Sequence, residues 1–283
     1  MSVSEYKAQH TSSPEREKTP ASQAGEVYLL LVQTLALPLV LASFLSQETG
    51  HDYGIGLIQK LWLLLKTYRN HRRIPGATSW YEHLIMIEAI LKLPPSTPGV
   101  VVECGCYKGA STANLSLACQ LTQRKLIVFD SFSGLPVPKS SDREHHCPTL
   151  GEIHTYTKGS FKGRLKEVRQ NLSRFGHLPS CQLVPGYFAK TLPKFHQSRQ
   201  KAVFVFTDVD LTDSLKTCLK YIWPNLHSLG VWFTHEAQHL EISQLFFDRP
   251  WWRRELKQKP PGLIGAGVGL PVGLKSTALG YTP

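Results

Sequence analysis

From Pro98 onward, short runs of β-branched and aromatic residues alternate with longer stretches of helical pattern. Strands bounded by Gly, Asp or Pro and separated by helices are typical of βαβ units, and continuous apolar runs are typical of parallel strands buried on both faces. We therefore predict an α/β fold, a mostly parallel twisted sheet with helices on both faces. The expected strands are VVVEC (100–104), LIVFD (126–130), CQLVPG (181–186), AVFVFTDVD (202–210) and GVWFTHE (230–236), and the expected helices are 110–121, 161–175, 191–195 and 213–226.

The part of the chain before this alternation divides into two segments. Residues 1–26 are polar, which predicts a disordered tail. Residues 27–68 are expected to form apolar N-terminal helices, and Val27–Leu45 carries no charge over 19 residues, close to the roughly 20 that span a bilayer. Pro38 would kink such a helix. A membrane helix, a helix packed on the body of the protein and a helix in a homo-oligomer interface all fit this segment. Residues 69–283 are expected to form the main domain.

Composition restricts the possible partners. Of the 283 residues, 42% are hydrophobic and 19% charged, as in globular proteins. The net charge of +11 suits nucleic acid or an anionic membrane, but no basic motif interleaved with aromatic residues is present, so we expect no nucleic-acid partner. The six cysteines match no zinc spacing, which favours a reducing compartment. We expect a cytoplasmic protein, and membrane association through Val27–Leu45 is the alternative.

The residues that end the first two expected strands suggest a binding site for an adenosine-containing ligand. Ligands of open α/β sheets bind outside the carboxyl ends of the strands. Here the first strand ends in Glu103, Gly105 lets the backbone turn sharply, and Gly109 precedes the next helix. The second strand ends in Asp130, whose two oxygens can accept hydrogen bonds from two ribose hydroxyls. The turn lacks the GxGxxG pattern of dinucleotide sites, yet these residues alone do not decide between NAD and S-adenosylmethionine.

The last two expected strands end in side chains that are able to bind a divalent metal. Asp208 and Asp210 follow the fourth strand, and His235 and Glu236 follow the fifth. Oxygen and nitrogen donors on adjacent strand ends predict a metal site. The alternative is that Asp210 or Asp213 caps the next helix.

The longest interruption of the alternation is the segment 131–158. It contains three prolines and the pair His145-His146. Loops of this length are often lids over a site, so we expect either a lid or a long surface excursion. The two histidines would then line the pocket under the lid or face solvent.

Several phrases of the chain resemble the macrocin O-methyltransferase family. This family comprises class I S-adenosylmethionine-dependent enzymes that methylate sugar hydroxyls of natural products. The resemblance covers roughly residues 69–281, and its most specific motifs have the form DSFxGLP and GYFxxTLP. The matching phrases are VVECGCYKGAST (101–112), DSFSGLP (130–136), KGSF (158–161), GYFAKTLP (186–193), DVDLTDS (208–214) and YIWPNLHSLGVWF (221–233).

The resemblance implies a Rossmann-like class I methyltransferase fold over 69–283 and a role for each matching residue. The cofactor would be S-adenosyl-L-methionine, with a hydroxylated small molecule as acceptor. Asp208 and His235 would be catalytic, and Asp208, Asp210, His235 and Glu236 would hold Mg or Mn. The cofactor would be bound by Glu103, Gly105, Cys106, Gly109 and Ser111 at its methionine end, by Asp130 and Ser131 at the ribose, and by Gly186 and Tyr187 near the adenine.

One departure from the family pattern concerns the metal. Where the family has two consecutive aspartates, this chain has His235-Glu236. Imidazole is a poor magnesium ligand, so the metal is expected to be different, weakly held or absent, and a histidine is available as the base. The same departure keeps open a second reading, a methyltransferase-like protein that binds the cofactor but is catalytically impaired.

Overall fold

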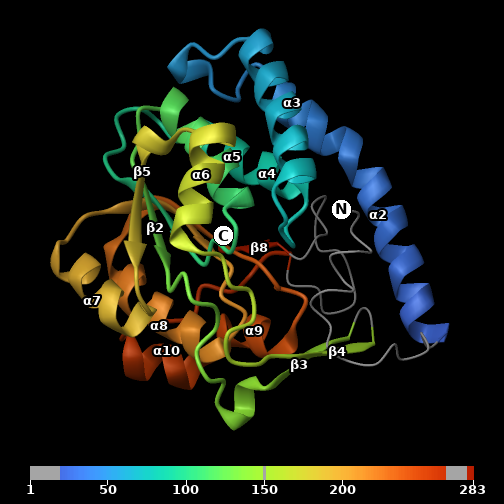
Figure 1. Cartoon of the computed structure of the whole chain (residues 1–283), viewed down its shortest axis with the longest axis vertical. Coiled ribbons are helices and arrows are strands. Elements are labelled where there is room, and N and C mark those ends of the chain that lie inside the picture. The colour runs from blue at the N-terminus through green and yellow to red at the C-terminus, as the bar shows by residue number, and fades with distance from the viewer. Residues whose placement is uncertain (1–19, 149–150, 266–278) are drawn as a thin grey trace.

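A computed structural model describes residues 20–148, 151–265 and 279–283 of the chain. Its centre is a six-stranded sheet in the order β5-β2-β1-β6-β7-β8, in which the first five strands are parallel and β8 is antiparallel to β7 (Figure 1). The expected mostly parallel sheet is confirmed. The strands are β1 (Val100–Cys104), β2 (Leu126–Asp130), β5 (Cys181–Pro185), β6 (Ala202–Thr207), β7 (Leu226–Thr234) and β8 (Gly280–Tyr281).

The order of the strands places a switch point between β1 and β6. The chain runs outward from β1 through β2 to β5 and then returns to β6 on the other side of β1. At such a switch the connections leave in opposite directions, which opens a crevice at the carboxyl ends of the two strands. Glu103 belongs to β1 and Asp208 directly follows β6, the two strands that flank this crevice.

Side chains alternate between the two faces of the sheet, and each face is covered by helices. Val101, Val128 and Phe204 belong to one buried cluster, which includes residues of α2 to α6. Val102, Phe129 and Val205 belong to the other, which includes residues of α7 to α10. The helices are α2 (Pro20–Leu45), α3 (Leu57–Arg73), α4 (Trp80–Leu91), α5 (Ala110–Leu121), α6 (Leu165–Phe175), α7 (Phe188–Gln197), α8 (Thr212–Ile222), α9 (Leu240–Leu245) and α10 (Arg249–Glu255).

The N-terminal helices differ from the expected boundaries. Residues 20–26, expected in the disordered tail, belong to α2, and residues 1–19 lie outside the described part of the chain. The expected boundary between residues 68 and 69 falls inside α3. Within the described residues, no helix has the length and apolarity needed to cross a bilayer.

The long segment 131–158 is not a plain loop. It carries a two-stranded antiparallel hairpin, β3 (Glu144–Cys147) and β4 (Glu152–Thr155), and a short 3-10 helix, Ser140–Asp142. Continuous apolar runs allowed the central strands to be predicted, whereas the EHHC and EIHT sequences of this hairpin lack that signal.

Candidate functional site

The carboxyl ends of five strands lie in a row, joined by backbone hydrogen bonds just beyond the ladder. Gly186 N–H donates to Asp130 O, Gly105 N–H to Phe129 O, Asp208 N–H to Cys104 O, and His235 N–H to Thr207 O, all at 2.8 to 2.9 Å. The strand ends that the sequence marked as a site are therefore neighbours along one edge of the sheet.

Gly105 brings the end of β1 into contact with the end of β6. Its φ is +82°, and a Cβ at this position would lie 1.8 Å from the backbone oxygen of Asp208. No side chain fits such a space, and a positive φ costs an L-residue roughly 1–2 kcal/mol. The glycine is therefore required for the close approach at the switch point.

Asp130 fixes the turn that follows β1. Its Oδ2 accepts from Cys106 N–H at 2.8 Å and its Oδ1 from Phe132 N–H at 2.6 Å. Burial raises the pKa of Asp130, although the backbone donors oppose the shift. Each oxygen keeps a further acceptor site. Asp130 thus holds together the exits of β1 and β2 and is still able to accept from a ligand.

Glu103 is a buried carboxyl with one free oxygen. Ser111 of α5 donates to its Oε1, whereas Oε2 is buried without a hydrogen-bond partner among the described residues. Burial raises the pKa of Glu103 to about 8, against the opposing hydrogen bonds of Ser111 and Thr112. An unpaired buried acceptor is costly, so this oxygen is suited to a cationic ligand.

His83 is a buried histidine that the sequence analysis did not single out, and it lies close enough to His235 for the two charges to interact. Asn70 Nδ2 donates to Asn114 Oδ1 at 2.8 Å, which turns the Asn114 amide nitrogen toward His83 Nδ1 at 2.7 Å. Nδ1 then accepts, so the proton lies on Nε2, which is buried and finds no partner among the described residues. Burial and the charges of His71 and His235 lower the pKa of His83 to about 3, so this donor is neutral.

Asp208 and His235 form an ion pair at the ends of β6 and β7. His235 Nδ1 lies 3.3 Å from Asp208 Oδ1, and Thr78 Oγ1 lies 3.5 Å from Asp208 Oδ2. Burial lowers the pKa of His235, but the adjacent Asp208 carboxylate outweighs it and raises that pKa to about 10. The raised pKa favours the imidazolium form of His235 at neutral pH. Thr78 precedes α4, so the N-terminal helices also contribute to this edge.

Asp210 and Glu236 form a separate pair beside it. Both have positive φ, 59° and 58°, and their side chains are hydrogen-bonded to each other. Tyr156 OH also donates to Glu236 Oε1 at 2.9 Å. Burial and the charge of Glu236 raise the pKa of Asp210 well above its ordinary value, so Asp210 donates the shared proton to Glu236.

These contacts do not provide the metal site that the sequence suggested. The four expected ligands are divided into two pairs, Asp208 with His235 at 3.3 Å and Asp210 with Glu236. Over the described ranges, no three His, Cys, Asp or Glu side chains gather as a metal ion requires. The described residues therefore do not support the expected divalent cation.

The expected capping roles of Asp210 and Asp213 are wrong as well. Asp142 of the 131–158 segment accepts from Thr212 N–H at 3.0 Å and from Asp213 N–H at 2.9 Å, and so satisfies the first turn of α8. Asp213 instead pairs with Lys139 at 2.6 Å. Because Asp142 lies 70 residues before the start of α8, the sequence around α8 gives no sign of this cap.

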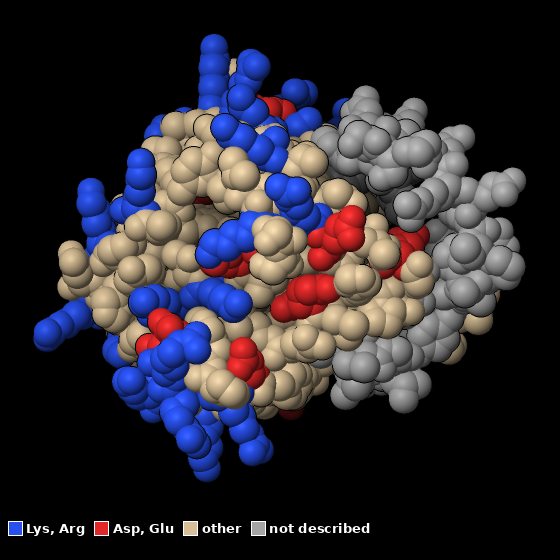
Figure 2. All heavy atoms as spheres, turned by 90° about the horizontal axis from the view of Figure 1, so that it is seen from below, with Lys and Arg blue, Asp and Glu red and all other residues tan. Residues whose placement is uncertain are grey.

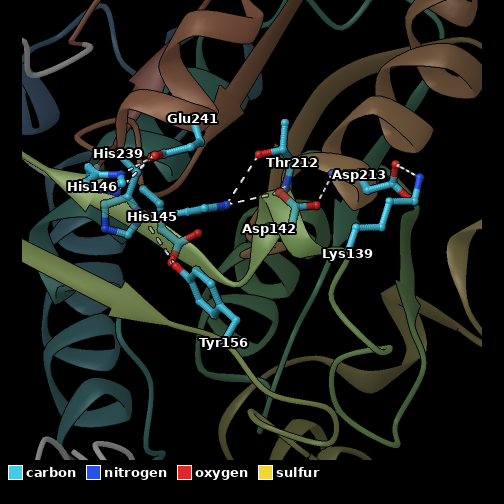
Figure 3. Close-up of polar contacts among 10 residues, drawn as sticks. Lys139, Asp142, His145, His146, Tyr156, Thr212, Asp213, His239 and Glu241 are labelled. Carbon is cyan, nitrogen blue, oxygen red and sulfur yellow. Dashed lines mark hydrogen bonds and ion pairs between the residues drawn. The ribbon is translucent and has the colours of Figure 1, made fainter.

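Contacts with α8 and α9 hold the hairpin segment against the rest of the protein (Figure 3). His145 is fully buried and its Nε2 lies 3.2 Å from Asp142 Oδ1, whereas His146 is exposed and contacts Glu241 of the α9 helix with both its backbone N–H and its ring. Tyr156, just after β4, reaches Glu236 from the same segment. The segment is thus tied to α8, α9 and the site.

The remaining predicted cofactor residues lie at this edge but have mostly structural contacts. Ser131 Oγ donates to Gly134 O at 2.8 Å within its turn. Gly186 (φ +135°) follows β5, and Tyr187, 38% exposed, precedes α7. Gly109 (φ +85°) occupies the N-terminal boundary of α5.

The charges of the visible face in Figure 2 are unevenly distributed. Lys and Arg side chains project around its margin, whereas several Asp and Glu side chains lie near the centre.

Comparison with known families decides the class of the protein. The family model of the macrocin O-methyltransferases (TylF) matches residues 86–244, more than half of the chain. The chain belongs to this family. It is accordingly an S-adenosylmethionine-dependent O-methyltransferase, as the resemblance implied. A comparison with curated proteins found no significant match.

Solved structures agree on the fold. The calicheamicin methyltransferase CalS11 is 17% identical over 96% of this chain and 98% of its own, with a TM-score of 0.51. The O-methyltransferase NovP is 16% identical over 91% of this chain and 98% of its own, with a TM-score of 0.49. The match to CalS11 confirms the Rossmann-like methyltransferase fold and extends over the N-terminal helices.

Proposed function

We propose that this macrocin O-methyltransferase family member transfers the methyl group of S-adenosylmethionine to a hydroxyl of a sugar carried by a natural-product small molecule. The observation that carries the proposal is the row of strand ends at the switch point, where Glu103, Asp130 and Asp208 lie along one edge. CalS11 and NovP, described as methyltransferases, agree with the same general class of reaction.

The residues present fit the cofactor. Glu103 offers a buried free oxygen to the ammonium of the methionine end, and Asp130 retains acceptor sites for ribose hydroxyls. Gly105 leaves space free of a side chain at the turn. When bound, S-adenosylmethionine supplies an electrophilic methyl group on a sulfonium.

We propose that His83 binds the carboxylate of the methionine moiety of the cofactor. Its buried Nε2–H has no partner among the described residues, and neither has Glu103 Oε2. The helix α5 connects the two, because Ser111 binds Glu103 and Asn114 binds His83 one turn later on the same side. A free donor and a free acceptor on neighbouring turns are complementary to a zwitterionic amino acid.

Asp208 is the proposed proton acceptor. The imidazolium of His235 already carries its proton, so it is a poor base. Each oxygen of Asp208 has one long contact, Oδ1 with His235 and Oδ2 with Thr78, and keeps a further acceptor site for a substrate hydroxyl. His235 would hold Asp208 in place and offset the negative charge that develops on the attacking oxygen. Asp208 would take the proton of the acceptor hydroxyl as its oxygen receives the methyl group, whose bond to the cofactor sulfur would break and leave S-adenosylhomocysteine.

The test is a transfer assay with methyl-labelled S-adenosylmethionine and a panel of sugars and glycosides. We expect label in a sugar hydroxyl and a loss of about 100-fold or more in kcat for Asp208→Asn. The matched variant Asp213→Asn, also an aspartate at this end of the sheet but paired with Lys139, should leave kcat unchanged. Equal activity of D208N and wild type would refute the role of Asp208.

A second candidate is a cofactor-binding protein with impaired catalysis. The pairing of Asp208 with His235 and the unfavourable metal donor set favour it. Binding of S-adenosylhomocysteine without label transfer to any acceptor in the panel would support this candidate over the first.

A further inference from the structure

The helix α3 has its amphipathic pattern reversed. Its buried side consists of Lys60, Leu63, Thr67 and Asn70, three of them polar. Lys60 is held by a hydrogen bond from Nζ to Ser46 O. The outward side carries large apolar residues, namely Leu57, Ile58, Leu61, Trp62, Leu65 and Tyr68, which are 39–83% exposed. A helix that faces only water normally shows the opposite arrangement.

The preceding helix α2 extends this apolar surface. Val27, Leu31, Leu35 and Leu39 recur at every fourth residue and are 46–73% exposed. Together α2 and α3 contribute ten of the fifteen exposed large apolar side chains found among the described residues. In Figure 1, α2 runs along the outer edge of the molecule, with α3 beside it. We call these ten side chains the α2–α3 face. Exposed patches of this kind mark protein or membrane contacts.

The charges around the α2–α3 face select its partner. At about 100° per residue, Arg69 and Arg72 lie on the same side of α3 as Leu61 and Leu65. Lys66 Nζ lies 5.6 Å from the centre of the Trp62 ring. Between residues 27 and 73 the acids are Glu48 and Asp52, both in the connection between the helices. A second copy of the chain would bring the same positive charges to this face, whereas anionic lipid head groups would neutralise them.

We propose that the α2–α3 face binds the surface of a membrane rich in anionic lipid. Apolar side chains would enter the boundary between head groups and acyl chains, while Trp62, Tyr68 and the basic side chains lie at head-group level. The helices would lie in the plane of the interface rather than cross it, in accord with the finding that no described helix is long and apolar enough to span a bilayer. This binding is independent of methyl transfer.

The test is flotation of the full chain with vesicles of phosphatidylcholine, alone or mixed with phosphatidylglycerol. Ile58→Gln, Leu61→Gln and Leu65→Gln combined should weaken binding to the mixed vesicles roughly 100-fold, since three apolar side chains would no longer be buried. Arg69→Gln with Arg72→Gln should weaken it by about 25-fold, roughly fivefold for each arginine. A matched control, Val137→Gln, Leu229→Gln and Phe247→Gln, changes three exposed apolar residues elsewhere and should bind like wild type.

Circular dichroism and sedimentation of the same samples without lipid complete the experiment. The proposal expects each variant to stay folded and its oligomeric state to match that of wild type. It is overturned if wild type fails to float with mixed vesicles, if it binds both vesicle types equally, or if the arginine variant binds normally. If wild type is a dimer that does not bind vesicles, and the combined Ile58, Leu61 and Leu65 variant is a monomer, the α2–α3 face is the contact with a second copy instead.

Discussion

At the scale of single residues, we predict that Glu103 couples cofactor binding to proton release. Its pKa of about 8, raised by burial, means that about nine-tenths of the carboxyl groups are protonated at pH 7 in the free protein. A bound ammonium favours the ionised form, so binding must expel that proton. We expect S-adenosylhomocysteine to bind more tightly as the pH rises from 6 to 8.

Calorimetry in two buffers of different ionisation enthalpy measures this release. We expect close to one proton per cofactor at pH 7 for wild type and none for Glu103→Gln, which should also bind more weakly. Glu167→Gln, on the exposed side of α6, is the control and should behave as wild type. Identical heats in both buffers for wild type would rule out this role for Glu103.

Gly105 is predicted to be required for a steric reason rather than for its φ alone. Gly105→Ala would place a Cβ against the Asp208 backbone, whereas Gly159→Ala has the same φ of +82° and open space around the new methyl. We expect Gly159→Ala to lower the unfolding free energy by about 1–2 kcal/mol. Gly105→Ala should lower it by clearly more and abolish cofactor binding. Chemical denaturation compares the two, and equal losses would contradict the close contact.

At the scale of elements, Asp142 should stabilise α8 from the hairpin segment. Asp142→Ala removes the acceptor for two backbone N–H groups and should lower the unfolding free energy by about 1–2 kcal/mol. Burial alone raises the pKa of Asp142, but hydrogen bonds from His145 and the α8 backbone outweigh it and hold the pKa below 3.8. The stabilisation is therefore present above pH 3.8 and is lost as the pH falls through the lower folded value.

Urea unfolding of wild type and D142A over a range of pH tests both points. The difference between them should be full at neutral pH and shrink toward zero in acid. Asp213→Ala, which removes only the exposed pair with Lys139, should cost less than about 1 kcal/mol. A difference between wild type and D142A that does not change with pH would contradict the role of the ionised carboxylate.

The elements also show what the sequence was able to predict. VVVEC and AVFVFT are mostly apolar because both strands are buried on both faces of the sheet. Such runs allow buried strands to be predicted from the sequence alone. The contact of Asp142 with α8 and the orientation of His83 by Asn70 and Asn114 join segments far apart in the chain, so no local pattern marks them. The structure does not support the predicted metal site for a similar reason, because residue types at strand ends do not reveal which side chains pair with each other.

At the scale of the whole molecule, the N-terminal helices and the sheet are predicted to unfold together. The hydrogen bonds of Asn114 join α3, α4 and α5 inside the protein. Asn114→Ala should lower the unfolding free energy by about 1–3 kcal/mol in a single transition, since buried partners lose their bonds. It should also weaken cofactor binding by releasing His83.

Asn225→Ala provides the comparison for this prediction. Asn225 is buried and donates to Phe195 O and His196 O, on the far side of the sheet from the N-terminal helices. This variant should lose stability but keep its affinity for S-adenosylhomocysteine, as titration calorimetry would show. Two separate transitions in N114A, or equal affinity losses in both variants, would contradict the proposed link.

The most direct test of the account is a crystal structure of the protein with S-adenosylhomocysteine. We predict that the ligand lies across the carboxyl ends of β1 and β2, with its amino group on Glu103, its carboxylate on His83, its ribose on Asp130 and its sulfur facing Asp208. A ligand bound elsewhere, or one whose sulfur points away from Asp208, would contradict the central claim that these strand ends form the methyl-transfer site.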